Sequence, residues 1–150
     1  MLKIQGPTVA ALLSASVAII VYAPAVQAKS YKVLHNFAGA TDDGDRPMSD
    51  VAFDNDGNLY GTTYSGGASD NGTIFKITPN GTESLLRSFS GGDGANPAAG
   101  VTIDPKTGDL YGLTESGGSA NDGVLYRLSA DGTFTALHAF AGGSDDGRYP

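Results

Sequence analysis

The sequence predicts an all-β fold of the β-propeller type, built from four-stranded blades. A repeated stretch contains LYGTTYSGG and SLLRSF in residues 51–89, and LYGLTESGG and TALHAF in residues 101–140. Tyr60 matches Tyr111 at a spacing of 51 residues. Glycine accounts for 22 of 150 residues and separates short stretches rich in Thr, Tyr, Phe and Val, which is typical of strands joined by tight turns. A period of about 50 with four strands per unit indicates propeller blades.

Each copy of the repeat contains four predicted strands. Asn55-Asp56-Gly57 and Pro79-Asn80-Gly81 are predicted hairpin turns, because proline fixes φ at the first corner and Asn and Gly tolerate a positive φ. The second copy makes the same turns with other residues, such as Asp131-Gly132 in place of Asn80-Gly81. In the first copy the predicted strands are 51–54, 58–63, 73–78 and 82–89, with a longer loop over 64–71.

The segments outside the two copies also match parts of the repeat. Residues 31–37 (YKVLHNF) match 83–89 and 134–140, which predicts an outer strand of the kind that completes the last blade of a ring. Residues 141–150 start a next repeat. The prediction is therefore two complete blades plus a leading outer strand, an incomplete propeller, since rings close with about four to eight blades. We expect a partial chain, with self-assembly of short chains into a ring as the alternative, and exposed blade flanks that favour self-association.

The first 28 residues have the three parts of a secretory signal peptide. Lys3 supplies the positive charge, residues 8–22 are uncharged and apolar, and Val26 and Ala28 are the small residues that a signal peptidase reads. Cleavage between Ala28 and Lys29 would leave residues 29–150 as the mature propeller region. An uncleaved membrane anchor is the alternative, but the apolar run is shorter than the roughly 20 residues that span a bilayer. We expect export, to the periplasm, the cell surface or the medium, and no membrane span in the mature chain.

Charge and cysteine content exclude several classes of partner and chemistry. The chain carries 9 Lys and Arg against 16 Asp and Glu, so its formal net charge is −7 and becomes −8 once Lys3 is removed. An acidic surface repels phosphate backbones and anionic lipids, so we expect no nucleic-acid partner. The sequence has no cysteine, which excludes disulfides, thiol catalysis and cysteine-based metal sites.

With LYGTT, SGG, GTIFK and LHxF at these spacings, the repeat resembles the GloVer-type tandem repeat of the choice-of-anchor bacterial surface proteins. The resemblance covers the chain from about Tyr31 to Pro150. It implies an exported repeat propeller whose C-terminus carries one of several surface-anchoring signals. This chain shows no such signal, because it stops inside the repeats. The resemblance carries over no catalytic residues.

One turn has some features of a calcium site. Asp54, Asp56 and Asn58 place oxygen ligands at alternate positions. An EF-hand loop needs glycine at its sixth position and glutamate at its twelfth, which here are Leu59 and Ser65. We therefore favour a hairpin turn and keep a weak calcium site as the alternative. No other metal ligand set and no cofactor-binding residue is predicted.

The histidines and the SGG serines recur with the repeat, which favours structural roles. His35 and His138 occupy one repeat position, which Arg87 fills in the copy between them, as expected of a half-buried strand position that needs a polar head. Ser65 and Ser116 lie in glycine-rich loops without a nucleophile or phosphate-loop motif. Further residues fit turns, core packing or solvated loop charge: the sequon-like Asn71 and Asn80, the recurring aromatics Tyr60, Phe75, Phe89, Tyr111, Tyr126 and Phe140, and the acidic Asp42, Asp43, Asp45, Asp145 and Asp146.

The sequence thus favours an exported repeat-propeller module with a binding or surface-structural role, without catalysis. Its partners would be an extracellular ligand or further repeats of the same kind. The alternative is part of a secreted propeller enzyme, a hydrolase or lyase acting on glycans, whose active-site residues lie outside this chain. Propeller enzymes place catalytic groups where one blade departs from the others, and these two copies depart little. No catalytic residue is named.

Overall fold

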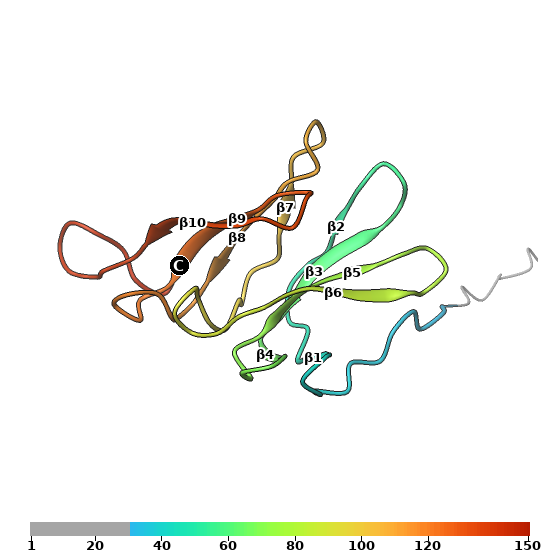
Figure 1. The fold of residues 1–150 in the computed structure, drawn as a ribbon, viewed down its shortest axis with the longest axis horizontal. Coiled ribbons are helices and arrows are strands. Elements are labelled where there is room, and N and C mark those ends of the chain that lie inside the picture. The colour runs from blue at the N-terminus through green and yellow to red at the C-terminus, as the bar shows by residue number, and fades with distance from the viewer. Residues whose placement is uncertain (1–30) are drawn as a thin grey trace, which may run out of the picture. The chain divides into compact units, whose positions relative to one another are not determined.

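The computed structural model describes residues 31–150, and within that range all regular structure is β (Figure 1). Each copy of the repeat forms one antiparallel sheet. The first sheet contains β2 (Ala52–Phe53), β3 (Leu59–Thr63), β5 (Thr73–Ile77) and β6 (Glu83–Ser88). The second sheet contains β7 (Thr102–Ile103), β8 (Leu110–Thr114), β9 (Val124–Leu128) and β10 (Phe134–Ala139). In the first copy these bounds lie within one residue of the predicted strands.

Both sheets are open meanders with the same connectivity. Their strand orders are β2-β3-β5-β6 and β7-β8-β9-β10, so neighbours in sequence are neighbours in the sheet. Every connection is therefore a hairpin or a short loop, as the turn residues predict. Neither sheet closes on itself. The all-β prediction is confirmed for the described residues.

The glycine of each LYG motif makes room for an aromatic ring. Gly61 pairs with Phe75 across β3 and β5, and Gly112 pairs with Tyr126 across β8 and β9. A Cβ at Gly61 would lie 2.6 Å from the Phe75 ring, and one at Gly112 would lie 2.3 Å from the Tyr126 hydroxyl. These distances are far below van der Waals contact, so a larger residue would displace the ring. The recurring glycines and aromatics are cross-strand partners.

The core lies between the two sheets. Phe89, which follows β6, packs against Tyr126 and Phe134 of the second sheet, with ring centroids 5.3 and 6.1 Å apart. Burying apolar side chains of this size stabilises the fold by about 1.5–3 kcal/mol each. The buried cluster consists of Ile74, Phe89, Val101, Leu110, Val124, Tyr126 and Leu128.

Only one face of the second sheet is covered. Along β9, Val124, Tyr126 and Leu128 are buried, whereas Leu125 and Arg127 between them are only half-buried. The alternation follows the period of two in a strand. In the first sheet the position equivalent to Leu125 is Ile74, which is 0% exposed because the second sheet covers it. The two sheets therefore differ in what lies against the same face.

A small third sheet was not predicted. The loop before the first sheet contributes β1 (Gly44–Asp45), which pairs antiparallel with β4 (Ser65–Gly66) in the 64–71 loop. The second copy repeats this arrangement as a single bridge between Ala95 and Ser116. The segment that precedes each sheet is thus tied to the SGG loop of that sheet.

The predicted outer strand at 31–37 is not formed, because residues 31–40 contain no strand. A fourth strand needs the free edge of a third strand. In the described residues both third strands are already paired, β5 with β6 and β9 with β10. Phe37 nevertheless packs against Phe75 at 4.8 Å, as Phe89 packs against Tyr126. Residues 31–37 therefore keep the aromatic contact at their C-terminal end but form no backbone hydrogen-bond ladder with a neighbouring strand.

The predicted signal peptide, with its cleavage site between Ala28 and Lys29, lies outside the described residues. Among the residues that are described, no helix is long and apolar enough to cross a membrane.

Candidate functional site

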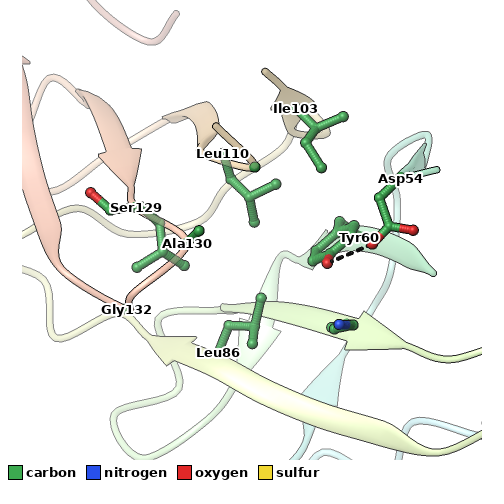
Figure 2. Close-up of a pocket in the computed structure, with 11 residues that line it drawn as sticks. Asp54, Tyr60, Leu86, Ile103, Leu110, Ser129, Ala130 and Gly132 are labelled. Carbon is green, nitrogen blue, oxygen red and sulfur yellow. Dashed lines mark hydrogen bonds between the residues drawn. The ribbon is translucent and has the colours of Figure 1, made fainter. Parts of the chain in front are cut away.

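A cleft of about 240 Å³ opens between the two sheets (Figure 2). Tyr60 on β3 and Leu86 on β6 line it from the first sheet, and Ile103 and Leu110 face them from the second. It lies at the end where the hairpin turns gather. Its lining residues are Asp54, Tyr60, Lys76, Leu86, Ile103, Gly108, Leu110, Leu128, Ser129, Ala130 and Gly132.

Asp54 organises the first-sheet side of this cleft. Its carboxylate accepts hydrogen bonds from the backbone N–H of Asp56 and of Asn58, both 2.9 Å, and from Asn58 Nδ2 at 2.7 Å. The Tyr60 hydroxyl donates a fourth at 3.0 Å, drawn as a dashed line in Figure 2. These bonds, the one from the Asn58 side chain foremost, lower the pKa of Asp54 to about 2. A carboxylate has about four acceptor positions, so the turn itself occupies them.

The structure brings the calcium candidates Asp54, Asp56 and Asn58 together as partners in a turn. Asn58 directs its amide N–H2 at Asp54, which fixes the hairpin rather than opening a cage of oxygens. Residues 31–150 contain no group of three or more His, Cys, Asp or Glu side chains placed to hold a metal. The calcium site stays a prediction that nothing here tests.

Lys76, the cationic residue that lines the cleft, has different surroundings from its equivalent in the second copy. Lys76 places its ammonium 5.5 Å from the centre of the Tyr60 ring and forms no ion pair with a described carboxylate. Its equivalent, Arg127, binds Asp109 through NH2 at 2.7 Å and Nε at 2.8 Å. Burial acts to raise the pKa of Asp109, but the Ala130 amide and Arg127 outweigh it and lower the pKa. The residue equivalent to Asp109 in the first copy is the neutral Asn58.

The two histidines are held in latches that recur with the repeat. His35 Nε2 lies 3.2 Å from the Asp43 carboxylate, and His138 Nε2 lies 3.0 Å from Asp146. Arg87 pairs with Asp93 at the same position in the copy between them.

Each aspartate of a latch also accepts a backbone hydrogen bond, from the N–H of Ala38, Ser90 or Ala141. The interpretation of Asp43 and Asp146 as solvated loop charge was therefore wrong. The side chain of Asp43, for example, is only 13% exposed. Its pKa is lowered, since the Ala38 amide and His35 outweigh the opposing effect of burial. The latch gives both histidines a structural partner.

The SGG loops are also used structurally. Gly66 and Gly67 have φ of +83° and +75°, a region that only glycine adopts readily. The Ser65 hydroxyl accepts a bond from Arg46 Nε at 2.8 Å, and the Ser116 hydroxyl donates to Asn96 Oδ1 at 2.7 Å. Both serines join their loop to the segment that precedes the sheet.

Asn96 joins the two sheets through its backbone and its side chain. Its N–H donates to Asn71 O at 2.8 Å, and its Nδ2 donates to Tyr64 O at 3.1 Å, both in the first repeat. Its carbonyl accepts from Glu115 N at 3.1 Å, and its side-chain oxygen accepts from Ser116 in the second. Asn96 has a positive φ of 55°, which Asn tolerates better than most residues, and Pro97 follows it. We call this arrangement the junction.

Half of the junction is present again at the C-terminal end of the described chain. Tyr149, with φ of 51°, donates its N–H to Asp122 O at 2.9 Å, as Asn96 does to Asn71. Pro150 lies over Gly123 as Pro97 lies over Gly72, where a Cβ would meet the proline at 2.7 and 2.6 Å. These residues hold the second sheet in the manner in which Asn96 and Pro97 hold the first.

The fold is that of an all-β repeat protein. One sheet follows another through a linking segment whose geometry recurs at Asn96 and in part at Tyr149. The chain belongs to the Gloeobacter/Verrucomicrobia repeat family, whose model matches residues 18–150. The predicted GloVer-type repeat is thereby confirmed, while the choice-of-anchor assignment stays a prediction. No curated protein and no solved structure matches the chain.

Proposed function

We propose that the chain is an exported repeat-propeller module, in which each sheet is one blade and the role is binding or surface structure rather than catalysis. The observation that carries this proposal is the half-junction at Tyr149 and Pro150. It repeats on the second sheet the contacts that Asn96 and Pro97 make on the first.

The open face of the second sheet supports the same proposal. Leu113 and Leu125 occupy the positions of Thr62 and Ile74, which are 1% and 0% exposed in the first sheet. A hollow of about 300 Å³ lies on this face, lined in part by Tyr111, Leu113 and Leu125. Half-buried apolar residues on a face that is buried in the neighbouring copy indicate a surface for another sheet. The partner of this face is a further repeat of the same kind.

Repeat stacking is tested by extending the chain with a second copy of residues 98–150 after Pro150. We expect a higher midpoint of thermal unfolding and a larger urea m-value in one cooperative transition, because the added sheet buries the open face. The matched control carries Leu125→Asp in the second sheet, which places a charge in the new interface and should remove the gain. Two separate transitions, or a gain that survives Leu125→Asp, would contradict the proposal.

Export is supported by the charged, apolar and small-residue parts of residues 1–28. Expression of the full chain in a bacterium, followed by mass spectrometry of the exported fraction, tests it. The expected product begins at Lys29. A full-length protein that stays in the cytoplasm would contradict export and would leave the stacking proposal untouched.

A further inference from the structure

The cleft between the sheets holds a cation, Lys76, which forms no ion pair within residues 31–150. In the second sheet, Arg127 is neutralised by Asp109, which is buried. In the first sheet, Lys76 replaces the arginine and the neutral Asn58 replaces the aspartate. This exchange is a departure from the repeat, and it removes the counter-charge at one residue of the cleft lining.

The ionised Asp54 lines the same cleft, but it does not pair directly with Lys76. Its carboxylate takes four hydrogen bonds from its own turn and from Tyr60, and no ion pair joins it to Lys76. The hydrogen bond from the Asn58 side chain foremost lowers the pKa of Asp54, so its carboxylate is ionised. Lys76 is thus the charged donor of the lining with capacity for a ligand.

The remainder of the cleft is largely apolar. Leu86 lies opposite Ile103 and Leu110 (Figure 2). Leu128 also lines the cleft and forms the wall on the second sheet together with Leu110. Leu110 and Leu128 are each 3% exposed, so this wall is fixed by the core behind it. A bare inorganic anion would gain nothing from the exposed surface that Leu86 and Ile103 keep, whereas an organic anion would bury its apolar part against it.

We propose that this cleft binds a small organic carboxylate, with the carboxylate on the Lys76 ammonium and an apolar body between Leu86 and the wall of Ile103, Leu110 and Leu128. The cleft volume of about 240 Å³ equals that of about eight water molecules at roughly 30 Å³ each, so the ligand must be small. That size corresponds to a benzoate or a hexanoate rather than a sugar chain or a fatty acid. The site is formed by the two sheets present here, so it does not depend on blade stacking.

The probe is benzoate, titrated into the full chain and followed by methyl NMR. We expect saturable shifts of the methyl groups of Ile103, Leu110 and Leu128, with a Kd on the order of 1 mM, as suits a ligand of this size. Lys76→Gln should weaken benzoate about tenfold or more, because it removes a charge-assisted hydrogen bond. Benzyl alcohol, the neutral analogue, should bind both proteins equally and weakly.

The matched control is Lys106→Gln, which removes the same charge from an exposed turn residue outside the cleft lining. It should leave the benzoate affinity unchanged, and an unchanged methyl spectrum of Lys76→Gln without ligand would show that the fold is intact. Raising NaCl from roughly 50 to 500 mM should weaken benzoate but not benzyl alcohol. Shifts that do not saturate, shifts outside the cleft, or equal benzoate affinity of Lys76→Gln and the unmodified chain would overturn the proposal.

Discussion

The two sheets have the same four strands in the same order, yet the face that carries Ile74 is covered in the first sheet, whereas the equivalent face is open in the second. Ile74 of the first sheet is 0% exposed, whereas Leu125 at the same position of the second is half-buried. Phe75 and Tyr126 on the other face are both buried, because Phe37 and Phe89 pack on them. Burial at a given repeat position is therefore decided by whether a neighbouring sheet follows, and the residue type alone does not reveal it.

The two copies differ in their charges as well as in burial. Asp109 and Arg127 form an ion pair in the second sheet, while Asn58 turns to Asp54 in the first and leaves Lys76 without a carboxylate. The latches vary less, since His35, Arg87 and His138 each keep an aspartate. Of the residues in this exchange, Lys76 lines the cleft, whereas Asp109 and Arg127 do not.

The largest expected effect separates the covered face from the open one. Ile74→Ala should lower the free energy of unfolding by about 2–5 kcal/mol, because it leaves a cavity between the sheets. Leu125→Ala should cost about 1 kcal/mol or less, because its site is half open to water. Urea unfolding followed by circular dichroism measures both, and Ile74→Val replaces the alanine variant if that does not fold. Equal losses would show that the faces do not differ as described.

A smaller effect distinguishes the complete junction from the half-junction. Asn96→Ala should cost about 2–3 kcal/mol, since it removes two side-chain hydrogen bonds and places alanine at a positive φ. Tyr149→Ala adds no backbone strain, because tyrosine already has a positive φ there, and it breaks no side-chain hydrogen bond; Tyr149 is 56% exposed. It should therefore cost about 1 kcal/mol or less. The same urea experiment compares them, and a Tyr149 effect as large as that of Asn96 would contradict the assignment.

The smallest effect concerns the turns after β2 and β7. Asp54 accepts four hydrogen bonds, whereas Asp104 at the equivalent position accepts one within its turn, from the backbone N–H of Lys106. The pKa of Asp54 in the folded chain is lowered to about 2, chiefly by the hydrogen bond from Asn58. The ionised carboxylate therefore stabilises the fold fully above the unfolded pKa of about 3.9, and this stabilisation is lost as the pH falls through about 2.

The side-chain carboxyl ¹³C shift of Asp54, titrated with acid, should have its midpoint near the lowered value. Asn58→Ala should move the midpoint upward, because it removes the largest single cause of the shift. A midpoint of about 3.9 in the unmodified chain would show that the turn lacks these bonds.

The strands and turns were readable from the sequence because they depend on local chemistry. Alternating apolar residues and Asn-Gly or Asp-Gly pairs specify hairpins without reference to distant residues. The outer strand at 31–37 was predicted wrongly for the opposite reason. Its side chains match those of β10, but a strand also needs a partner edge, which sequence similarity cannot supply.

The sites depend on pairs that are distant in sequence or that lie in loops of variable length. Asp43 lies 8 residues after His35, whereas Asp93 lies 6 after Arg87, so the latch does not follow a fixed spacing. The cleft was missed because it combines residues from both copies. An alignment of the two copies shows Asn58 in place of Asp109 and Lys76 in place of Arg127. It does not show that Arg127 and Asp109 form an ion pair, which the structure reveals.

Cysteine labelling tests most directly the central claim that a further sheet packs on the open face of the second sheet, which carries Leu125. The chain has no cysteine, so Leu125→Cys introduces a single reporter, with Ile74→Cys as the covered reference. In the chain of 150 residues, Leu125→Cys should react with a maleimide far faster than Ile74→Cys. In the chain extended by a second copy of residues 98–150, its rate should fall to that of Ile74→Cys. An unchanged rate at position 125 in the extended, folded chain would contradict the account.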